Sequence, residues 1–133
     1  MINIILDLLK TKLWEVTYVK EILFINKEPE QTPQVIIQWD TSSENQIQSL
    51  ISNMTSFFKL TVRMPFVNEE EDVLFFNWLI SDIVEKLNTN KTLDNTVENI
   101  IITSIEPDNN DDWSKKRVYT ISLEISYKVN ISE

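Results

Sequence analysis

The clearest hydrophobic pattern in the sequence is a strict alternation that runs from Val118 to Val129. Every second position in it is apolar or aromatic, namely Tyr119, Ile121, Leu123, Ile125, Tyr127 and Val129. A period of two over this length is typical of a β-strand with one buried and one solvated face. A second alternation, from Phe58 to Phe66, predicts another strand of the same kind, and Pro65 marks its end.

Two other segments place apolar residues at helical spacing. In residues 2–14 the apolar face consists of Ile2, Ile5, Leu6, Leu9 and Leu13. Residues 69–88 predict a longer helix, for which Asn68 is a suitable N-cap. Its apolar stripe consists of Val73, Phe76, Ile80, Ile83, Val84 and Leu87, and it is widened by Phe75, Trp78 and Leu79. Because so wide a stripe needs more than one neighbour, we expect this helix to contact both its own sheet and another subunit.

Three shorter apolar segments, residues 16–25, 35–39 and 97–105, predict further strands. The last two are apolar on both faces, and segment 35–39 is expected at the centre of the sheet. Residues 40–56 allow two interpretations. Helical spacing relates four of their apolar residues: Ile47, Leu50, Ile51 and Met54. This spacing favours a short helix over the alternative, a long polar hairpin arm.

Together these elements predict a fold of the α+β class. We expect about five strands in a mostly antiparallel or mixed sheet, with two or three helices packed on one of its faces. The length of 133 residues fits one domain, which is predicted to span residues 1–133.

The composition excludes several kinds of chemistry, because the sequence contains no glycine, no cysteine and no histidine. Phosphate-binding loops and dinucleotide fingerprints need glycine, whose backbone lets a phosphate approach closely. Zinc sites of the usual kind need cysteine or histidine, and so do the common nucleophile–base pairs. We therefore expect no enzymatic activity, no catalytic residues, and neither a cofactor nor a metal site.

The net charge of −9 at pH 7 disfavours nucleic acid as a direct partner, because phosphate backbones select basic surfaces. The sequence contains no apolar run of about 18 residues, so no membrane partner is expected. The densest charged run is Glu69-Glu70-Glu71-Asp72. It coincides with the first turn of the predicted helix, where the helix dipole favours negative charge, and this structural role is preferred over cation binding.

A second acidic segment, Asp108 to Asp112, has the ligand spacing of the first half of a calcium loop. Such a loop needs glycine at its sixth position and glutamate at its twelfth, and Trp113 and Tyr119 stand there instead. A solvated turn between two strands is therefore expected, without calcium.

The basic residues Lys115, Lys116 and Arg117 follow this turn after Trp113 and Ser114. Acidic neighbours favour pairing of opposite charges, within the hairpin or between subunits, over nucleic-acid binding. Most of the tryptophans are expected in the core, and Trp113, in the most polar surroundings, is the best candidate for an interface anchor. The residues predicted at a subunit or partner interface are Trp113, Lys115, Lys116, Arg117, Asp111, Asp112, Phe75 and Trp78.

The second half of the chain combines these elements in a recognisable order. A helix to Leu87 is followed by a polar stretch, a strand, an acidic turn that bears a tryptophan, and a closing strand, at residues 92–96, 100–105, 108–113 and 119–127. This order resembles the tail terminator (tail completion) proteins of long-tailed bacteriophages. The first helix and the strands at 35–39 and 58–65 match the same family in order. Segment 40–56 departs from it, because the family tends to carry an extended hairpin there.

The resemblance implies a structural function in the virion. Proteins of that family assemble as a hexameric ring on the end of the tail tube, stop its polymerisation and present a surface to the head. The implied partners are further copies of the chain, the tail tube protein and the head–tail connector protein, with DNA only as a passing cargo. The implied location is the tail or neck of the virion, after assembly in the host cytoplasm.

Other functions stay open on the sequence alone. The chain could be another neck or head–tail joining component, or a protein that stabilises the sheath of a contractile tail. A different class, an acidic inhibitor or DNA mimic of a host enzyme, is suggested by the negative charge. A carboxylate-dependent enzyme is disfavoured, because no pair of carboxylates can be placed in one pocket.

Overall fold

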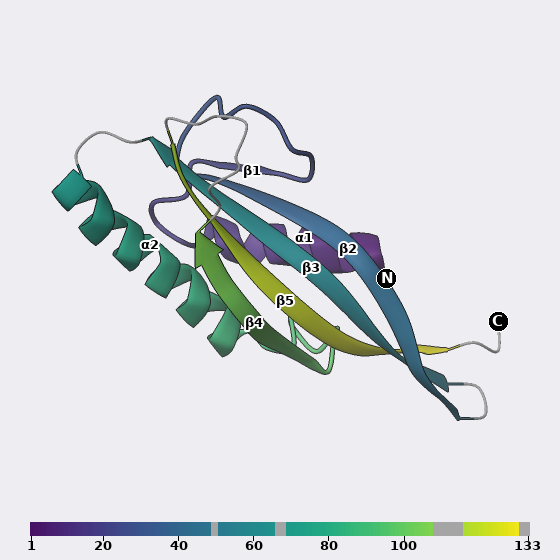
Figure 1. Ribbon diagram of the computed structural model, residues 1–133. Helices are drawn as coiled ribbons and strands as arrows, with labels where there is room; N and C mark the ends of the chain where they lie inside the picture. The colour runs from purple at the N-terminus through teal and green to yellow at the C-terminus, as the bar shows by residue number, and fades with distance from the viewer. Residues whose placement is uncertain (49–50, 66–68, 108–115, 131–133) are drawn as a thin grey trace.

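The structure of the chain, a computed structural model, describes residues 1–48, 51–65, 69–107 and 116–130. Within these ranges the side chains are described except at residues 43–48, 51–52, 65, 69–73, 116–117 and 130. A five-stranded sheet forms one layer, and two helices form a second layer behind it (Figure 1).

The order of elements along the chain determines the topology of the sheet. This order is α1 (Ile2–Trp14), β1 (Glu21–Leu23), β2 (Gln34–Gln48), β3 (Ile51–Pro65), α2 (Glu69–Thr89), β4 (Asn99–Pro107) and β5 (Lys116–Asn130). Across the sheet the strands follow the order β1-β2-β3-β5-β4. β1 runs parallel to β2, and the other neighbouring pairs are antiparallel. The predicted α+β class, with a mixed sheet and helices on one face, is confirmed.

The core lies between the helices and one face of the sheet. α1 contributes Ile5, Leu9 and Leu13, and α2 contributes Phe76, Leu79, Ile83 and Leu87. The alternations predicted from the sequence supply the facing side chains of β3 and β5, among them Phe58, Leu60, Val62, Ile121, Leu123 and Ile125. Each fully buried side chain of this kind contributes roughly 1.5–3 kcal/mol, so this interface dominates the stability of the fold.

The expectation of a helix at residues 40–56 was wrong. Strands β2 and β3 continue through this segment as a hairpin, in which Ser42 pairs with Ser56 and Gln48 with Ile51. β3 also pairs with β5 along this part, as far as Ile51 opposite Asn130. Hydrogen bonding on both sides of β3 outweighs a local spacing that fits a helix equally well. The hairpin forms a slender arm that extends past the helices (Figure 1).

The strand predicted at residues 16–25 was too long, because only Glu21–Leu23 is extended. Val16 and Val19 are buried in the core from the turn before β1. The expectation that most tryptophans lie in the core was also wrong among the described residues. Trp14, Trp39 and Trp78 are 46%, 47% and 62% exposed.

β4 lies at the edge of the sheet, and its outer side has no strand partner among the described strands. Ile100 is buried on the helix-covered face, whereas Ile101, on the opposite face, is largely exposed. The apolar character of both faces of this strand therefore does not reflect burial on both faces. A register shift between Ile102 and Ser104 is the one irregularity in the pairing of β4 with β5.

The connection between α2 and β4 contains a left-handed turn built without glycine. Leu93, Asp94 and Asn95 have φ values of 44°, 58° and 67°. Asparagine and aspartate tolerate this region, but leucine occupies it at a cost of roughly 1–2 kcal/mol. The turn is held because Leu93 is fully buried and because Asp94 forms an ion pair of 3.1 Å with Lys12 of α1.

Candidate functional site

The predicted interface residues around the acidic turn lie mainly outside the described residues. This holds for Asp111, Asp112, Trp113 and Lys115. Lys116 and Arg117 begin β5, where their backbones pair with Pro65 and Met64 at the end of β3. Since α2 begins only four residues after Pro65, this basic start of β5 and the acidic first turn of α2 lie at the same end of the sheet.

The outward surface of α2 carries two exposed apolar side chains. Leu74 and Trp78 are separated by one helical turn and are 56% and 62% exposed. Helical spacing places both of them opposite the buried stripe of this helix. Asp82 and Glu85 continue the same surface and are exposed. We call Leu74, Trp78, Asp82 and Glu85 the α2 patch.

Phe75, the other interface residue predicted on this helix, is engaged within the chain. Its ring contacts the ring of Tyr18 edge to face, with centroids 5.0 Å apart. The side chain is half-buried and helps attach the turn after α1 to α2. Trp78, three residues further along the same helix, is instead 62% exposed.

A second exposed apolar surface follows β1, and the sequence interpretation did not single it out. Phe24 and Ile25 come directly after this strand, and Ile25 is 64% exposed. The ammonium of Lys10 lies 5.4 Å from the centroid of the Phe24 ring, and Lys20 precedes the strand. We call Lys10, Lys20, Phe24 and Ile25 the β1 patch. In the sequence, the signal for this surface was the apolar pair Phe24-Ile25 next to the polar loop that contains Pro29 and Pro33.

The loop after β1 is attached to the sheet by a buried arginine. Arg63 of β3 is 2% exposed, and its guanidinium donates hydrogen bonds to the Gln34 Oε1, the Asn26 Oδ1 and the Lys27 carbonyl oxygen. The donor–acceptor distances are 3.1, 2.7 and 3.2 Å in that order. The planar fork of arginine suits three acceptors from separate segments. This loop therefore has a defined position on the sheet face away from the helices.

Carboxylates complete this loop network. Glu21 accepts a hydrogen bond of 2.6 Å from the Gln34 side-chain amide, and Lys27 pairs with Glu30 at 3.0 Å. The hydrogen bond and the charge of Glu30 raise the pKa of Lys27 above its ordinary value. Because the Lys27 pKa is raised, the stabilisation from this ion pair is fully present at a pH below the ordinary lysine pKa. It is lost only when the pH rises through the raised pKa. The loop therefore keeps this contact throughout the neutral range.

A chain of hydroxyl groups closes the base of the arm. The Trp39 indole N–H donates to the Ser42 Oγ at 2.9 Å. The Oγ atoms of Ser42 and Ser56 are 2.6 Å apart, and the Oγ of Ser56 lies 2.8 Å from the hydroxyl of Tyr127. Ser56 and Tyr127 are buried, so these contacts satisfy polar groups that water does not reach.

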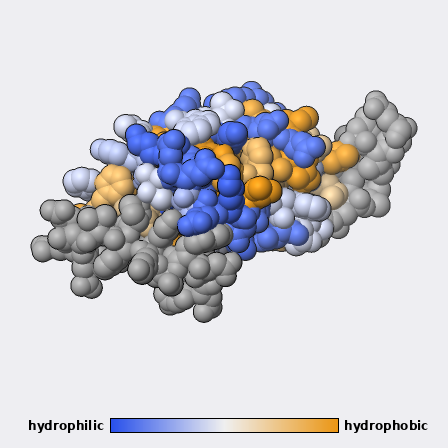
Figure 2. Space-filling view, turned by 90° about the horizontal axis from the view of Figure 1, so that it is seen from above, coloured by the Kyte–Doolittle hydropathy of each residue, from blue (hydrophilic) through white to orange (hydrophobic). Residues whose placement is uncertain are grey.

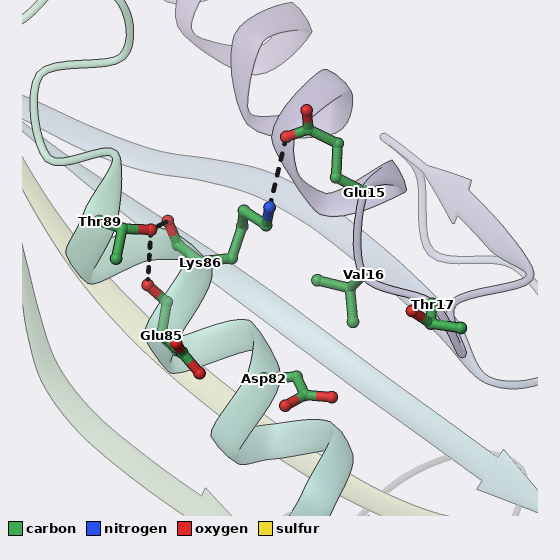
Figure 3. Close-up of a pocket in the computed structure, with 7 residues that line it drawn as sticks. All are labelled: Glu15, Val16, Thr17, Asp82, Glu85, Lys86 and Thr89. Atoms are coloured by element: carbon green, nitrogen blue, oxygen red, sulfur yellow. Dashed lines mark hydrogen bonds and ion pairs between the residues drawn. The ribbon is translucent and has the colours of Figure 1, made fainter.

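A cavity of about 250 Å³ lies between the end of α1 and the second half of α2 (Figure 3). Lys86 reaches across it toward Glu15, with the ammonium 3.6 Å from the carboxylate (Figure 3). Asp82 and Glu85 of the α2 patch also line it. The lining is polar and partly closed by its own ion pair, so it offers no enclosed apolar binding site.

No group of three or more acidic side chains among the described residues could hold a metal ion. No described helix is long and apolar enough to cross a membrane. The surfaces that remain for function are the two patches, the arm and the free edge of β4. In comparisons with known proteins, no protein-family model and no curated protein sequence matches this chain.

Proposed function

We propose that this chain is a structural virion protein that caps the end of a phage tail tube as a ring. In this role it stops tube polymerisation and provides the surface to which the head connector attaches. Its partners are further copies of itself, the tail tube protein and the connector protein, and DNA passes through the ring only as cargo. It acts in the tail or neck of the virion and needs no catalytic group.

The observation that carries the proposal is the hairpin arm formed by β2 and β3. The sequence resembles tail terminators in the order of its elements, and segment 40–56 departed from that order only because its spacing favours a helix. The segment is instead an extended hairpin, which is what the resemblance implies. Segment 40–56 therefore agrees with the order of elements that the resemblance implies.

The exposed surface of the molecule also supports a role in assembly. Trp78 is 62% exposed on a helix that already covers the sheet. Exposed tryptophans are over-represented at binding hot spots, and an apolar edge strand such as β4 is normally covered or paired. A ring subunit has a neighbour on each side, which would cover both features.

Electron microscopy of tail tubes tests the proposal directly. Purified chain is added to tubes assembled from the tube protein encoded in the same genome, and the tube ends are imaged. We expect rings at one end of each tube and an arrest of further tube growth. Chain that binds no tube and leaves tube length unchanged would overturn the proposal. Binding along the tube wall would instead favour a sheath-stabilising protein.

A further inference from the structure

We infer that copies of this chain join edge to edge, with β4 of one copy paired antiparallel to the open outer side of β2 in the next. The sheet then continues across the joint, with the helices of both copies on the same face. This pairing rests on the ring of the proposed function and adds the strands that join its subunits. The backbone and the apolar side chains at the two ends of the sheet carry it, and its charges do not.

Both ends of the sheet have a strand side without a partner among the described strands. At one end the outer side of β4, Asn99–Pro107, is open. At the other end β1 pairs only with Gln34 to Ile36 of β2, so the outer side of β2 is open from Ile37 onward. Backbone groups along such a side can accept another strand. Three antiparallel steps separate β2 from β4, so the two strands already run in opposite directions and suit an antiparallel joint.

Each open side carries an exposed apolar side chain on the helix-covered face of the sheet. Trp39 of β2 pairs with the buried Phe58, and Ile105 of β4 pairs with the buried Ile121, so the register places both on the core face. They are nevertheless 47% and 41% exposed. A strand added at each end would cover both side chains and extend the core that is already there.

The extents of the two open sides favour one register for the joint. When Pro107, the last residue of β4, lies opposite Ile37, the first open residue of β2, all of β4 is paired and β1 is not displaced. In this antiparallel register Ile105 lies directly opposite Trp39. Residues directly opposite one another share a face of the sheet, so the two exposed side chains meet on the helix side. A slip of one residue would place Ile105 opposite Gln38 and lose this contact.

The charged groups at the joint oppose the pairing weakly. Asp40 on the β2 side and Glu106 on the β4 side are exposed, and Glu98 is already in an ion pair of 3.3 Å with Lys128. In the register described, neither Asp40 nor Glu106 lies directly opposite another described carboxylate. The net charge of −9 adds a general repulsion between copies. Because salt screens this repulsion, added salt should strengthen the association, whereas an interface held by opposite charges would weaken.

A contact between the two different ends covers more of the molecule than a two-fold contact does. Two copies joined through β4 alone would cover Ile105 and leave Trp39 and the open side of β2 exposed. β2 and β4 lie at the two sides of the sheet, so one copy can use both at once (Figure 1). Such heterologous contacts form a ring when the rotation between subunits closes. In Figure 2, which views the molecule from above, hydrophobic groups lie between hydrophilic ones, so this view shows no single broad apolar face.

Disulfide trapping tests this pairing, because the chain contains no cysteine of its own. A full-length variant with Trp39→Cys and Ile105→Cys should form, on mild oxidation, a ladder of covalent oligomers up to the closed ring on non-reducing gels. A second variant, with Gln38→Cys and Glu106→Cys, tests the adjacent pair of the same register and keeps both apolar side chains. Adjacent pairs of an antiparallel ladder alternate between Cα separations of about 5.5 and 4.5 Å, which both lie within the range of disulfides.

The matched control combines Trp39→Cys with Ile101→Cys. Ile101 lies in the same strand as Ile105 and is 47% exposed, but it lies on the opposite face of the sheet, where it pairs with Glu124. This variant should therefore form no ladder, and circular dichroism should show the same fold for all three variants. A control that forms the same ladder reports random collision and overturns the pairing. A covalent dimer of the single variant Ile105→Cys would show a two-fold contact through β4 and overturns it as well.

Native mass spectrometry of the unchanged chain separates failure of the pairing from failure of the ring. Its apparent dissociation constant should fall at least about 3-fold between about 0.05 and 0.5 M salt, because the Debye length shortens. Association that weakens with salt overturns the pairing. Rings of unchanged chain, with neither cysteine pair trapped, refute the pairing and leave the ring intact. Unchanged chain that is monomeric at every concentration, again with neither pair trapped, removes the ring itself.

Discussion

Arg63 shows how one buried residue can fix a loop that has no regular structure. Its guanidinium joins three segments, because its acceptors are the side chains of Asn26 and Gln34 and the carbonyl oxygen of Lys27. The two prolines of that loop prevent regular secondary structure. The position of the β1 patch thus depends on a cation that the alternating pattern of β3 places on the face away from the core.

Replacement of Arg63 by lysine should lower the free energy of unfolding by roughly 2–4 kcal/mol. Hydrogen bonds to a buried charged group contribute more than neutral ones, and lysine cannot reproduce the fork of donors. Urea denaturation measures the change. Lys59→Met, at a half-buried site on the same sheet face, is the control and should change stability by less than about 1 kcal/mol. An Arg63→Lys variant as stable as the control would contradict this role.

The hydroxyl contacts at the base of the arm lead to a prediction about Tyr127 and Ser56. Tyr127→Phe should cost about 1 kcal/mol, because it leaves the buried Ser56 hydroxyl without the Tyr127 oxygen that lies 2.8 Å from it. Ser56→Ala should cost a similar amount, and the double variant should cost less than the sum. A double-mutant cycle from thermal or urea unfolding measures this coupling. Strictly additive effects would show that the two hydroxyl groups do not act together.

At the scale of elements, β3 is the organising strand of the sheet. It pairs with β2 on one side and with β5 on the other over most of its length, whereas β4 pairs on one side only. Local stability follows such pairing, because interior strands open only when much of the sheet opens. This arrangement also accounts for the arm, which is an outward continuation of the same three strands.

Hydrogen exchange should therefore rank the strands in a definite order. Backbone amides of β3 between Phe57 and Val62 are expected to exchange most slowly, at rates that report global unfolding. In β4, amides that point away from β5 should exchange much faster than those that point toward it. Exchange measured by NMR on dilute chain gives both rates. Rapid exchange throughout β3 would contradict the double pairing.

The sequence pattern of helix α2 could not separate its buried residues from its exposed ones. The apolar stripe predicted for it contains both core residues, such as Phe76 and Leu79, and the exposed Trp78. Periodicity shows that the stripe is too wide for one neighbour, and this expectation agrees with the exposure of Trp78. Which residues face the sheet depends on how the helix is rotated, and packing against α1 and the sheet determines that rotation.

At the scale of the whole molecule, assembly should be visible in thermal stability. Association through native surfaces stabilises the folded state by mass action, so the melting temperature of the unchanged chain should rise with protein concentration. For Trp39→Glu it should stay constant over the same range. Differential scanning calorimetry at several concentrations measures both. A concentration-independent melting temperature of the unchanged chain would indicate that the exposed surfaces do not associate.

Much of the fold could be predicted from local patterns. The period of two in β3 and β5 and the helical spacing in α1 and α2 identified these elements, because their buried positions recur within a few residues. The absence of glycine, cysteine and histidine also excluded several kinds of site before any geometry was considered. These features need no information about residues that are distant in the sequence.

Tertiary structure alone decided the remaining features. The spacing of Ile47, Leu50 and Ile51 fits a helix, but pairing of β3 with both β2 and β5 makes the segment extended. Strand order, the Arg63 network and the difference in burial between Phe75 and Trp78 arise from contacts between distant segments. Sequence thus determined which faces of the strands and helices are apolar, and the three-dimensional packing determined which of those faces are buried and which stay exposed.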